Sequence, residues 1–242
     1  MNSDITAATV ASILGPERPV GAPEVRMIFV SSINGEAAVA GTSGALGNAT
    51  DFQVLLGARA WADVVMVGAG TVRAENYGGV RLDEATQHAR RARGQAPVPP
   101  LAVVGRTLDF APDSRVLSDT HVPPLFLRLP GSPEPAPALA SESTIELDSF
   151  TAGECLARLR EAGFARILCE GGPTLYSKFM AEDCVDVVHW TLDPSFVYPQ
   201  RVPVFPRASH EGDAASLRHR FGLRSATPCE DGVLFLRYDR LR

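Results

Sequence analysis

The sequence predicts an α/β fold in which a mostly parallel central sheet ends in antiparallel C-terminal strands. Short apolar runs alternate with helical patterns between residues 25 and 192, as expected when helices connect parallel strands. The end of the chain differs, because two strand-like runs follow one another there with only a turn near residues 229–232 between them. No boundary divides this pattern, so we expect one domain over residues 25–242, preceded by a loosely attached leader over residues 1–24.

The individual elements follow from local patterns. A strand over residues 25–30 opens the domain, and a long glycine-rich loop over residues 31–52 follows it. Thr50 or Asp51 is expected to cap the next helix. Residues 83–100 and 130–137 are interpreted as irregular surface stretches, because prolines and clustered charges interrupt the pattern there. Further strands are predicted at residues 63–67, 101–104, 125–129, 144–147, 166–169, 185–192, 217–226 and 232–240, and helices at residues 5–14, near residue 72, and at residues 151–162 and 174–181.

Composition argues against several classes of function. The 242 residues carry a formal net charge of −5, whereas general binding to nucleic acid or anionic membranes needs a positive surface. No apolar run approaches the roughly 20 residues of a membrane helix, and no signal-peptide pattern opens the chain, so a cytoplasmic protein is expected. The four cysteines are scattered without zinc-ligand spacing, which predicts free thiols and no metal site.

Three turns begin with glycine or glutamate-glycine directly after a predicted strand. They are GAGTVRAENYGG at residues 68–79, GRTLD at residues 105–109 and EGGPTLYSKFM at residues 170–180. Glycine leaves the backbone open, so the free amides of a first helical turn can face an anion such as a phosphate. Arg106 and Thr107 add a guanidinium fork and a hydroxyl to the second turn. The alternatives are that the glycines only let helices pack closely on the sheet, and that Arg106 is an ordinary solvated cation.

The named nucleotide motifs do not cover these turns. Arg73 stands where the dinucleotide fingerprint GxGxxG requires its third glycine, and the sequence has no GK[ST] loop for a nucleoside triphosphate. Two strand–glycine–helix turns and one arginine turn nevertheless predict a ligand with separated anionic or polar groups.

Three longer segments, in this order along the chain, resemble a known family. SSINGEAAVAGTSG, ARAWADVVMVGAGTVRAENY and ILCEGGPTLYSKFMAEDCVDVVHWTLDP are similar to the reductase domain of the riboflavin-pathway pyrimidine deaminase/reductase family. The resemblance covers residues 25–194 well and the rest loosely. It implies a dihydrofolate-reductase-like three-layer fold, NADPH-dependent hydride transfer, and a homodimer formed through the C-terminal strands. The HxE and PCxxC zinc site of the deaminase half is absent from this sequence, so deamination is not expected.

The resemblance also implies which residues contact each ligand. Two acids stand out, since hydride delivery to an imine or carbonyl carbon leaves a nitrogen or oxygen that needs a proton. Asp51 is the first candidate for this catalytic role and Glu75 the second; the alternatives are a helix cap for Asp51 and an exposed first-turn acid for Glu75. The expected coenzyme-binding residues are Gly68, Gly70, Thr71, Val72, Gly105, Arg106, Thr107, Glu170, Gly171, Gly172, Pro173, Thr174 and Leu175. The expected substrate-binding residues are Ser31, Ser32, Asn34, Thr42, Ser43, Asp51, Arg73 and Glu75.

The sequence departs from the family at two places. Glu36 stands where pathway reductases commonly have a lysine or arginine for a sugar phosphate, and FVYPQR at residues 196–201 replaces a glycine-rich turn. Three hypotheses therefore remain open. The first is reduction of a ribosylaminopyrimidine phosphate, the second is reduction of a pterin such as dihydrofolate, and the third is a non-catalytic dinucleotide-binding sensor or scaffold.

Overall fold

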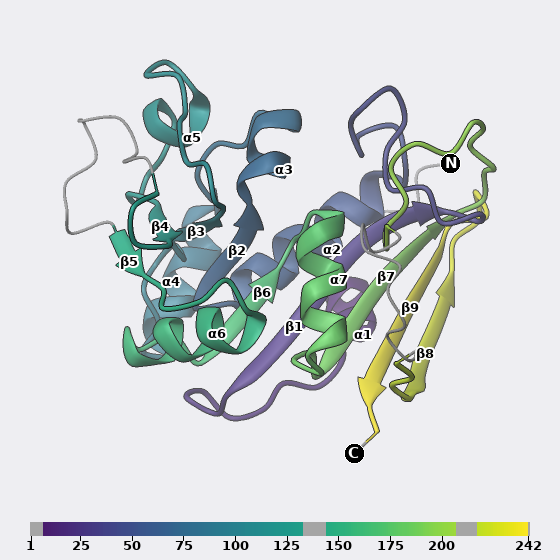
Figure 1. The fold of residues 1–242 in the computed structure, drawn as a ribbon. Helices are drawn as coiled ribbons and strands as arrows, with labels where there is room; N and C mark the ends of the chain where they lie inside the picture. The colour runs from purple at the N-terminus through teal and green to yellow at the C-terminus, as the bar shows by residue number, and fades with distance from the viewer. Residues whose placement is uncertain (1–6, 133–143, 207–216, 242) are drawn as a thin grey trace.

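A nine-stranded sheet forms the centre of the molecule (Figure 1). The computed structural model describes residues 7–132, 144–206 and 217–241. Within them, the strand order is β5-β4-β3-β2-β6-β1-β7-β9-β8. Every pair from β5 to β7 is parallel, and β9 pairs antiparallel with both β7 and β8. The predicted α/β class with antiparallel C-terminal strands is confirmed.

The elements lie close to their predicted positions. The strands are β1 (Glu24–Ser32), β2 (Val64–Gly68), β3 (Leu101–Val104), β4 (Leu125–Arg128), β5 (Thr144–Glu146), β6 (Arg166–Cys169), β7 (Val187–Asp193), β8 (Phe221–Pro228) and β9 (Leu234–Arg240). The helices are α1 (Ala7–Leu14), α2 (Ala49–Trp61), α3 (Ala69–Ala74), α4 (Glu84–Ala92), α5 (Arg115–Ser118), α6 (Ala152–Glu161) and α7 (Pro173–Ala181). Residues 133–137 of the predicted surface loop and residues 1–6 of the predicted leader lie outside the described residues.

Two local predictions were wrong. Residues 84–92 form helix α4 instead of an irregular stretch, and the Asp83 side chain caps it by accepting a hydrogen bond from Thr86 N at 2.7 Å. This helix escaped detection because Arg90 is its buried residue, so it has no apolar stripe. Helix α2 is capped by Asn48, whose side chain accepts from Asp51 N at 3.0 Å, and not by Thr50 or Asp51.

Two hydrophobic cores separate the sheet from its helices. Alternate residues of each buried strand point to opposite faces, so Val65 belongs to one core and Met66 to the other. Helices α1 and α2 cover the first core, and α6 and α7 cover the second (Figure 1). From residue 7 the N-terminal segment packs onto the domain, since Ile13 and Leu14 are only 3% and 8% exposed. The result is the expected three-layer arrangement.

The parallel strands place their carboxyl ends at one edge of the sheet. β1, β2, β3, β6 and β7 all end there, beside α3, the beginning of α7 and the loop between β1 and α2 (Figure 1). Ligands of parallel α/β sheets commonly bind at this edge. Among the described helices, none combines the length and apolarity needed to cross a membrane. All four cysteines are free.

Candidate functional site

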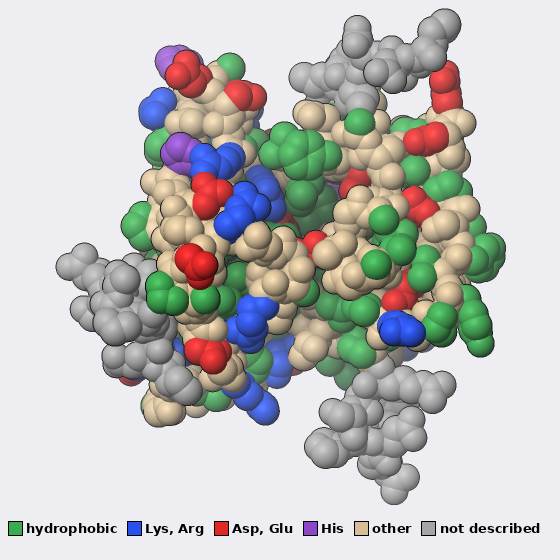
Figure 2. Space-filling model, turned by 90° about the horizontal axis from the view of Figure 1, so that it is seen from above, with side chains coloured by type: hydrophobic (Ala, Val, Ile, Leu, Met, Phe, Trp, Pro, Cys, Tyr) green, Lys and Arg blue, Asp and Glu red, His purple; other side chains and the backbone are tan. Residues whose placement is uncertain are grey.

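The three predicted turns meet at the carboxyl edge of the sheet. The first (residues 68–79) follows β2, the second (residues 105–109) follows β3 and the third (residues 170–180) follows β6; we call them the β2, β3 and β6 turns. These three strands are neighbours in the sheet, in the order β3-β2-β6. Gly68 N donates a hydrogen bond to Gly171 O at 2.5 Å, which joins the first turn to the third. A Cβ atom at Gly105 would lie 2.6 Å from the Ala69 side chain, so the second turn packs against the first. Figure 2 views the molecule from this side and shows its surface hollowed near the centre.

The glycines of the third turn are required by packing. Gly171 has a φ of +98°, and a Cβ atom there would lie 2.4 Å from the ring of Tyr176. At Gly172 a Cβ atom would lie 2.2 Å from Thr71 Oγ1. Gly171 is therefore needed for the close approach of Tyr176 of α7, and Gly172 for that of Thr71 of α3, whatever binds beside them.

Gly70 is different, because the protein itself gives no packing reason for it. It lies within α3, where alanine would be more favourable by up to about 1 kcal/mol. Apart from its chain neighbours and the backbone of its own helix, no atom of the described residues lies within 4 Å of the place where its Cβ would be. The second glycine of the β2 turn is therefore open to a ligand that needs close access to the backbone.

Glu170 is bound by the protein's own side chains. It is 6% exposed, and its carboxylate accepts hydrogen bonds from Arg59 Nε and Nη2, both at 2.7 Å, and from Tyr77 OH at 3.0 Å. Burial alone would lower the pKa of Arg59, but the Glu170 carboxylate outweighs it and raises that pKa above its usual value. The Glu170 side chain thus ties the β6 turn to α2 and to the segment after α3. Sequence reasoning missed Arg59 and Tyr77, because no local spacing connects them to Glu170.

Asp51 lies in the first turn of α2 as a half-buried carboxyl. Thr191 Oγ1 of β7 donates a hydrogen bond to its Oδ1 at 2.6 Å. Burial raises the pKa of Asp51; the Thr191 hydrogen bond opposes this and the nearby Asp193 charge adds to it, so the net pKa lies above its usual value. A carboxyl in this state keeps its proton to higher pH than an exposed one, which suits a proton donor.

Glu75 and Ser43 connect the long loop to α3. Ser43 N donates to Glu75 Oε1 at 2.7 Å. Thr42 and Val39 exchange two backbone hydrogen bonds, at 2.8 and 3.2 Å, which closes a tight turn just before Ser43. Three predicted substrate residues thus lie on the loop and on the helix end that holds it.

Ser31 and Asn34 lie away from Asp51, on the face of the sheet that α7 covers. Ser31 Oγ accepts a hydrogen bond from Trp190 Nε1 at 2.9 Å. Both residues line a cavity of about 650 Å³ that is otherwise formed largely by apolar side chains of β1, α7 and the C-terminal strands. Ser32 Oγ donates to Asn34 Oδ1 at 2.8 Å. The predicted substrate residues are therefore divided between the two faces of the sheet and do not form one cluster.

Glu36 points into the protein. It is 1% exposed, and its Oε1 accepts hydrogen bonds from the backbone amides of Arg201 (2.9 Å) and Val202. This acid therefore holds the segment that replaces the family's glycine-rich turn, and its charge is directed away from the solvent.

The side chains of the two arginines singled out in the sequence both lie at the turn after β3. Arg106 is exposed, with its guanidinium 5.9 Å from the ring centroid of Phe150. Arg73 reaches from α3 to the Thr107 carbonyl oxygen, at 3.3 and 3.4 Å from its two terminal nitrogens. Across residues 7–132, 144–206 and 217–241, no group of three histidine, cysteine or acidic side chains could hold a metal ion.

Comparisons with known proteins agree with this architecture. The riboflavin biosynthesis protein RibD of Mycobacterium tuberculosis is 32% identical in an alignment of 194 residues that covers 77% of this chain and 48% of that protein. This chain thus spans about half the length of the curated relatives it matches. A pyrimidine reductase-like protein from Corynebacterium diphtheriae has a TM-score of 0.82 at 27% identity, with 96% of this chain and 98% of that one covered.

The fold is that of dihydrofolate reductase. The Enterococcus faecalis enzyme, at 10% identity, has a TM-score of 0.51 over 90% of this chain and 97% of its own. The family model of the RibD C-terminal domain matches residues 23–227, most of the sequence. The chain therefore belongs to the RibD C-terminal domain family and is a reductase-type domain, an oxidoreductase.

Proposed function

We propose that this chain is an NADPH-dependent reductase of a pyrimidine intermediate of riboflavin biosynthesis, of the ribosylaminopyrimidine phosphate type. The observation that carries the proposal is the meeting of three backbone turns at one edge, with an open position at Gly70. A dinucleotide has separated phosphates that need such turns, and a glycine without packing neighbours gives its backbone room to approach. As in the family it resembles, we place the protein in the cytoplasm.

The coenzyme-binding residues proposed are those of the three turns. The backbone of the β2 and β6 turns would hold the pyrophosphate and the nicotinamide side, and Arg106 with Thr107 would hold the adenosine 2′-phosphate. Glu170 would act on this site by fixing the β6 turn through Arg59, since its carboxylate is engaged by that side chain. When bound, NADPH supplies the hydride.

Asp51 would supply the proton. Its position in the first turn of α2 and its raised pKa fit a group that donates a proton to the nitrogen or oxygen next to the reduced carbon. Glu75 would act by holding Ser43 and the long loop beside the substrate. The direction of Glu36 removes the main objection to a phosphorylated substrate, because its carboxylate binds backbone amides within the protein.

A direct experiment separates the three hypotheses. NADPH absorbance would be followed with the ribosylaminopyrimidine phosphate and with dihydrofolate offered in parallel. Turnover of the pyrimidine supports the proposal, turnover of dihydrofolate alone makes the protein a pterin reductase, and coenzyme binding without either reaction makes it a sensor or scaffold. In an active enzyme, Asp51→Asn should abolish turnover while the affinity for NADPH stays unchanged.

Coenzyme choice is tested at Arg106. Arg106→Ala should weaken NADPH by about 1.5 to 3 kcal/mol, the usual loss of a charged hydrogen-bonded contact, and should leave NADH nearly unchanged. Titration calorimetry with both coenzymes measures this difference. Equal loss for the two coenzymes would remove Arg106 from the 2′-phosphate site.

We also propose that a second copy of the chain covers the cavity beside the C-terminal strands, as the family resemblance suggests. Its lining includes Trp190, Phe221 and the 46%-exposed Phe205, and apolar surfaces of this kind mark interfaces. Phe221→Glu should then convert a dimer into a monomer in light-scattering measurements, whereas Val20→Glu, at another exposed apolar residue, should not. A wild-type protein that is monomeric at high concentration would contradict the proposal.

A further inference from the structure

Arg73 joins two of the turns that the proposed function assigns to the coenzyme. It lies near the end of α3, within the β2 turn, and its side chain extends to the β3 turn. Its terminal nitrogens lie 3.3 and 3.4 Å from Thr107 O, and Nη1 is 3.5 Å from Asp109 O and 3.7 Å from Asp109 Oδ1. The guanidinium also lies 5.2 Å from the ring centroid of Phe110. One planar side chain therefore holds the backbone of residues 107–110.

Arg106 lies between residues 107–110, which Arg73 holds, and Gly105, which packing holds in place. On its N-terminal side, Gly105 packs so closely on Ala69 that no side chain fits there. On the other flank, the Arg106 guanidinium lies over the ring of Phe150. Lys178 of α7 fixes Phe150 by donating a hydrogen bond to its carbonyl oxygen, and the Lys178 ammonium lies 5.2 Å from the same ring. The backbone that carries Arg106 is thus held before and after it.

We infer that Arg73 is a positioning residue that sets the preference for the 2′-phosphorylated coenzyme, by holding the β3 turn so that Arg106 is ready for the phosphate. The inference rests on the proposed function. An exposed arginine on a free loop loses conformational entropy when it binds a phosphate, and a turn fixed in advance reduces that loss. In this inference Arg73 acts on the coenzyme through Arg106, in place of the substrate-binding role that the family resemblance implies.

The test is a double-mutant cycle on coenzyme affinity. Kd values for NADPH and NADH would be measured by calorimetry for the wild-type protein, Arg73→Ala, Arg106→Ala and the double variant. Arg73→Ala should reduce the NADPH/NADH preference by about three- to tenfold, with NADH affinity unchanged, because only the phosphate contact depends on the fixed turn. The double variant should match Arg106→Ala alone, because a residue that acts only through Arg106 has nothing left to change once Arg106 is gone.

Three further variants separate positioning from charge and from general stability. Asp109→Asn removes the ion pair but keeps the Arg73 bonds to the backbone carbonyls, so the preference should stay within about twofold of wild type. Arg73→Lys keeps the charge but lacks the planar fork, so it should restore little of the preference. Arg224→Ala removes an exposed arginine that pairs with Asp239 on the distant β8–β9 strands, and it should change neither affinity.

Each contrary outcome has a distinct meaning. A further loss of preference in the double variant would show that Arg73 contacts the phosphate itself, which overturns the positioning role. An unchanged preference in Arg73→Ala together with a raised KM for the substrate would overturn it as well and return Arg73 to the substrate site. If Arg73→Ala does not fold, Arg73→Lys provides the same cycle. A wild-type protein that binds no NADPH would instead refute the proposed function itself.

Discussion

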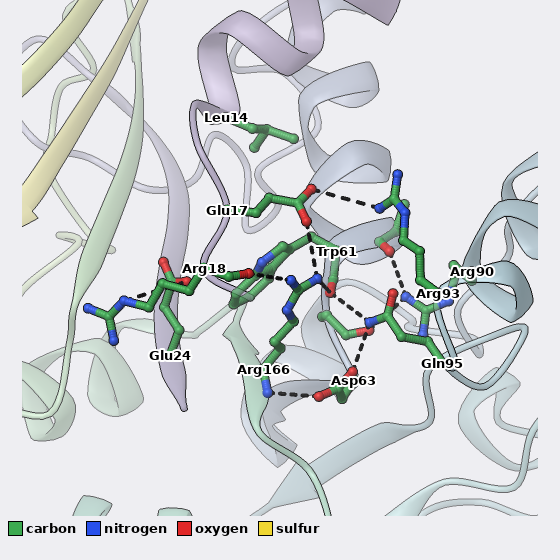
Figure 3. Close-up of polar contacts among 12 residues, drawn as sticks. Leu14, Glu17, Arg18, Glu24, Trp61, Asp63, Arg90, Arg93, Gln95 and Arg166 are labelled. Carbon is green, nitrogen blue, oxygen red and sulfur yellow. Dashed lines mark hydrogen bonds and ion pairs between the residues drawn. The ribbon is translucent and has the colours of Figure 1, made fainter. Parts of the chain in front are cut away.

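The two edges of the sheet use polar groups in opposite ways. At the amino edge, where the parallel strands begin, three arginines are at most 1% exposed and donate hydrogen bonds to backbone carbonyls. They are Arg26, Arg90 and Arg166. Figure 3 shows Arg90 and Arg166 in this network, together with Trp61 and Glu17. At the carboxyl edge the turns present backbone and glycine, and the arginines there are partly or fully exposed.

The comparison teaches that a cluster of arginines is not by itself an anion site. Arg90 alone donates to the carbonyl oxygens of Arg59, Ala60 and Ala62, which are the free acceptors at the end of α2. Gln95 donates to the Trp61 carbonyl oxygen beside them. The amino edge is therefore closed by its own hydrogen bonds, and the edge with fewer buried charges is the one suited to a ligand.

The largest effect on stability is expected from removing a buried arginine of the amino edge. Arg90→Met leaves three buried or partly buried carbonyl oxygens at the end of α2 without this donor, which should cost about 2 to 4 kcal/mol of unfolding free energy. Urea denaturation measures this cost. The exposed neighbour Arg91→Met should change stability by less than about 0.5 kcal/mol. Equal losses in both variants would contradict the capping role of Arg90.

A buried histidine on β7 links stability to pH. Burial, reinforced by Arg26 and Arg237, lowers the pKa of His189 to about 3, and within the described residues neither ring nitrogen has a hydrogen-bond partner. The unfolded chain takes up the proton near pH 6.5 and the folded protein does not, so stability falls as pH drops from about 6.5 towards 3.

Replacing that histidine should remove this part of the pH dependence. Between pH 7.5 and pH 5, wild type should lose about 2 kcal/mol more than His189→Phe, because each pH unit below the unfolded pKa contributes about 1.4 kcal/mol. Urea titrations at both pH values measure the difference. The exposed His88→Gln serves as the control, and identical pH slopes for wild type and His189→Phe would exclude His189 as the source.

At the carboxyl edge the effect should fall on binding and not on folding. Gly70→Ala places a methyl group where, beyond its chain neighbours and its own helix backbone, the described residues have no atom within 4 Å, so stability should be unchanged or slightly higher. Affinity for NADPH, the proposed coenzyme, should drop by about tenfold or more, because the methyl group would keep the coenzyme away from the protein backbone at this position. Gly153→Ala in α6 is the matched control and should leave NADPH affinity unchanged. Normal affinity in Gly70→Ala would remove this position from the coenzyme site.

The smallest effect concerns Asp51, the proposed proton donor. The Thr191 hydrogen bond favours the charged form of Asp51 and so lowers a pKa that burial has raised. In Thr191→Val that pKa should rise further, by up to about one unit. The rate falls as pH rises and Asp51 loses its proton, so this descending limb of kcat/KM should move to higher pH. An unmoved limb with a lower rate would indicate that Thr191 has only a structural role.

The sequence allowed good predictions where one local pattern decides the outcome. Continuous apolar runs such as the one in β2 mark strands buried on both faces, and glycine after such a run marks the turn at its carboxyl end. Helix α4 could not be predicted in this way, because its contact with the core is made by the guanidinium of Arg90 and not by an apolar stripe.

The site was harder to predict where contacts join distant segments. Arg59 and Tyr77 meet Glu170 only because β2 and β6 become neighbours in the sheet. Ser31 and Asp51 are both polar residues near the long loop, but strand alternation sends Ser31 to the face opposite Thr191 and Asp51. Residue types alone show neither which strands pair nor on which face of the sheet a side chain near a strand end lies.

The hydrogen bond between Gly68 and Gly171 has a consequence for synthesis of the chain. It joins an early strand to a late one, and β6 lies between β2 and β1 in the finished sheet. A nascent polypeptide that has not yet produced β6 lacks one of the three turns and also the strand that brings β1 and β2 into one sheet. With the proposed coenzyme, ribosome-bound chains should therefore acquire affinity late and in a single step, so retention of NADPH would report completed assembly.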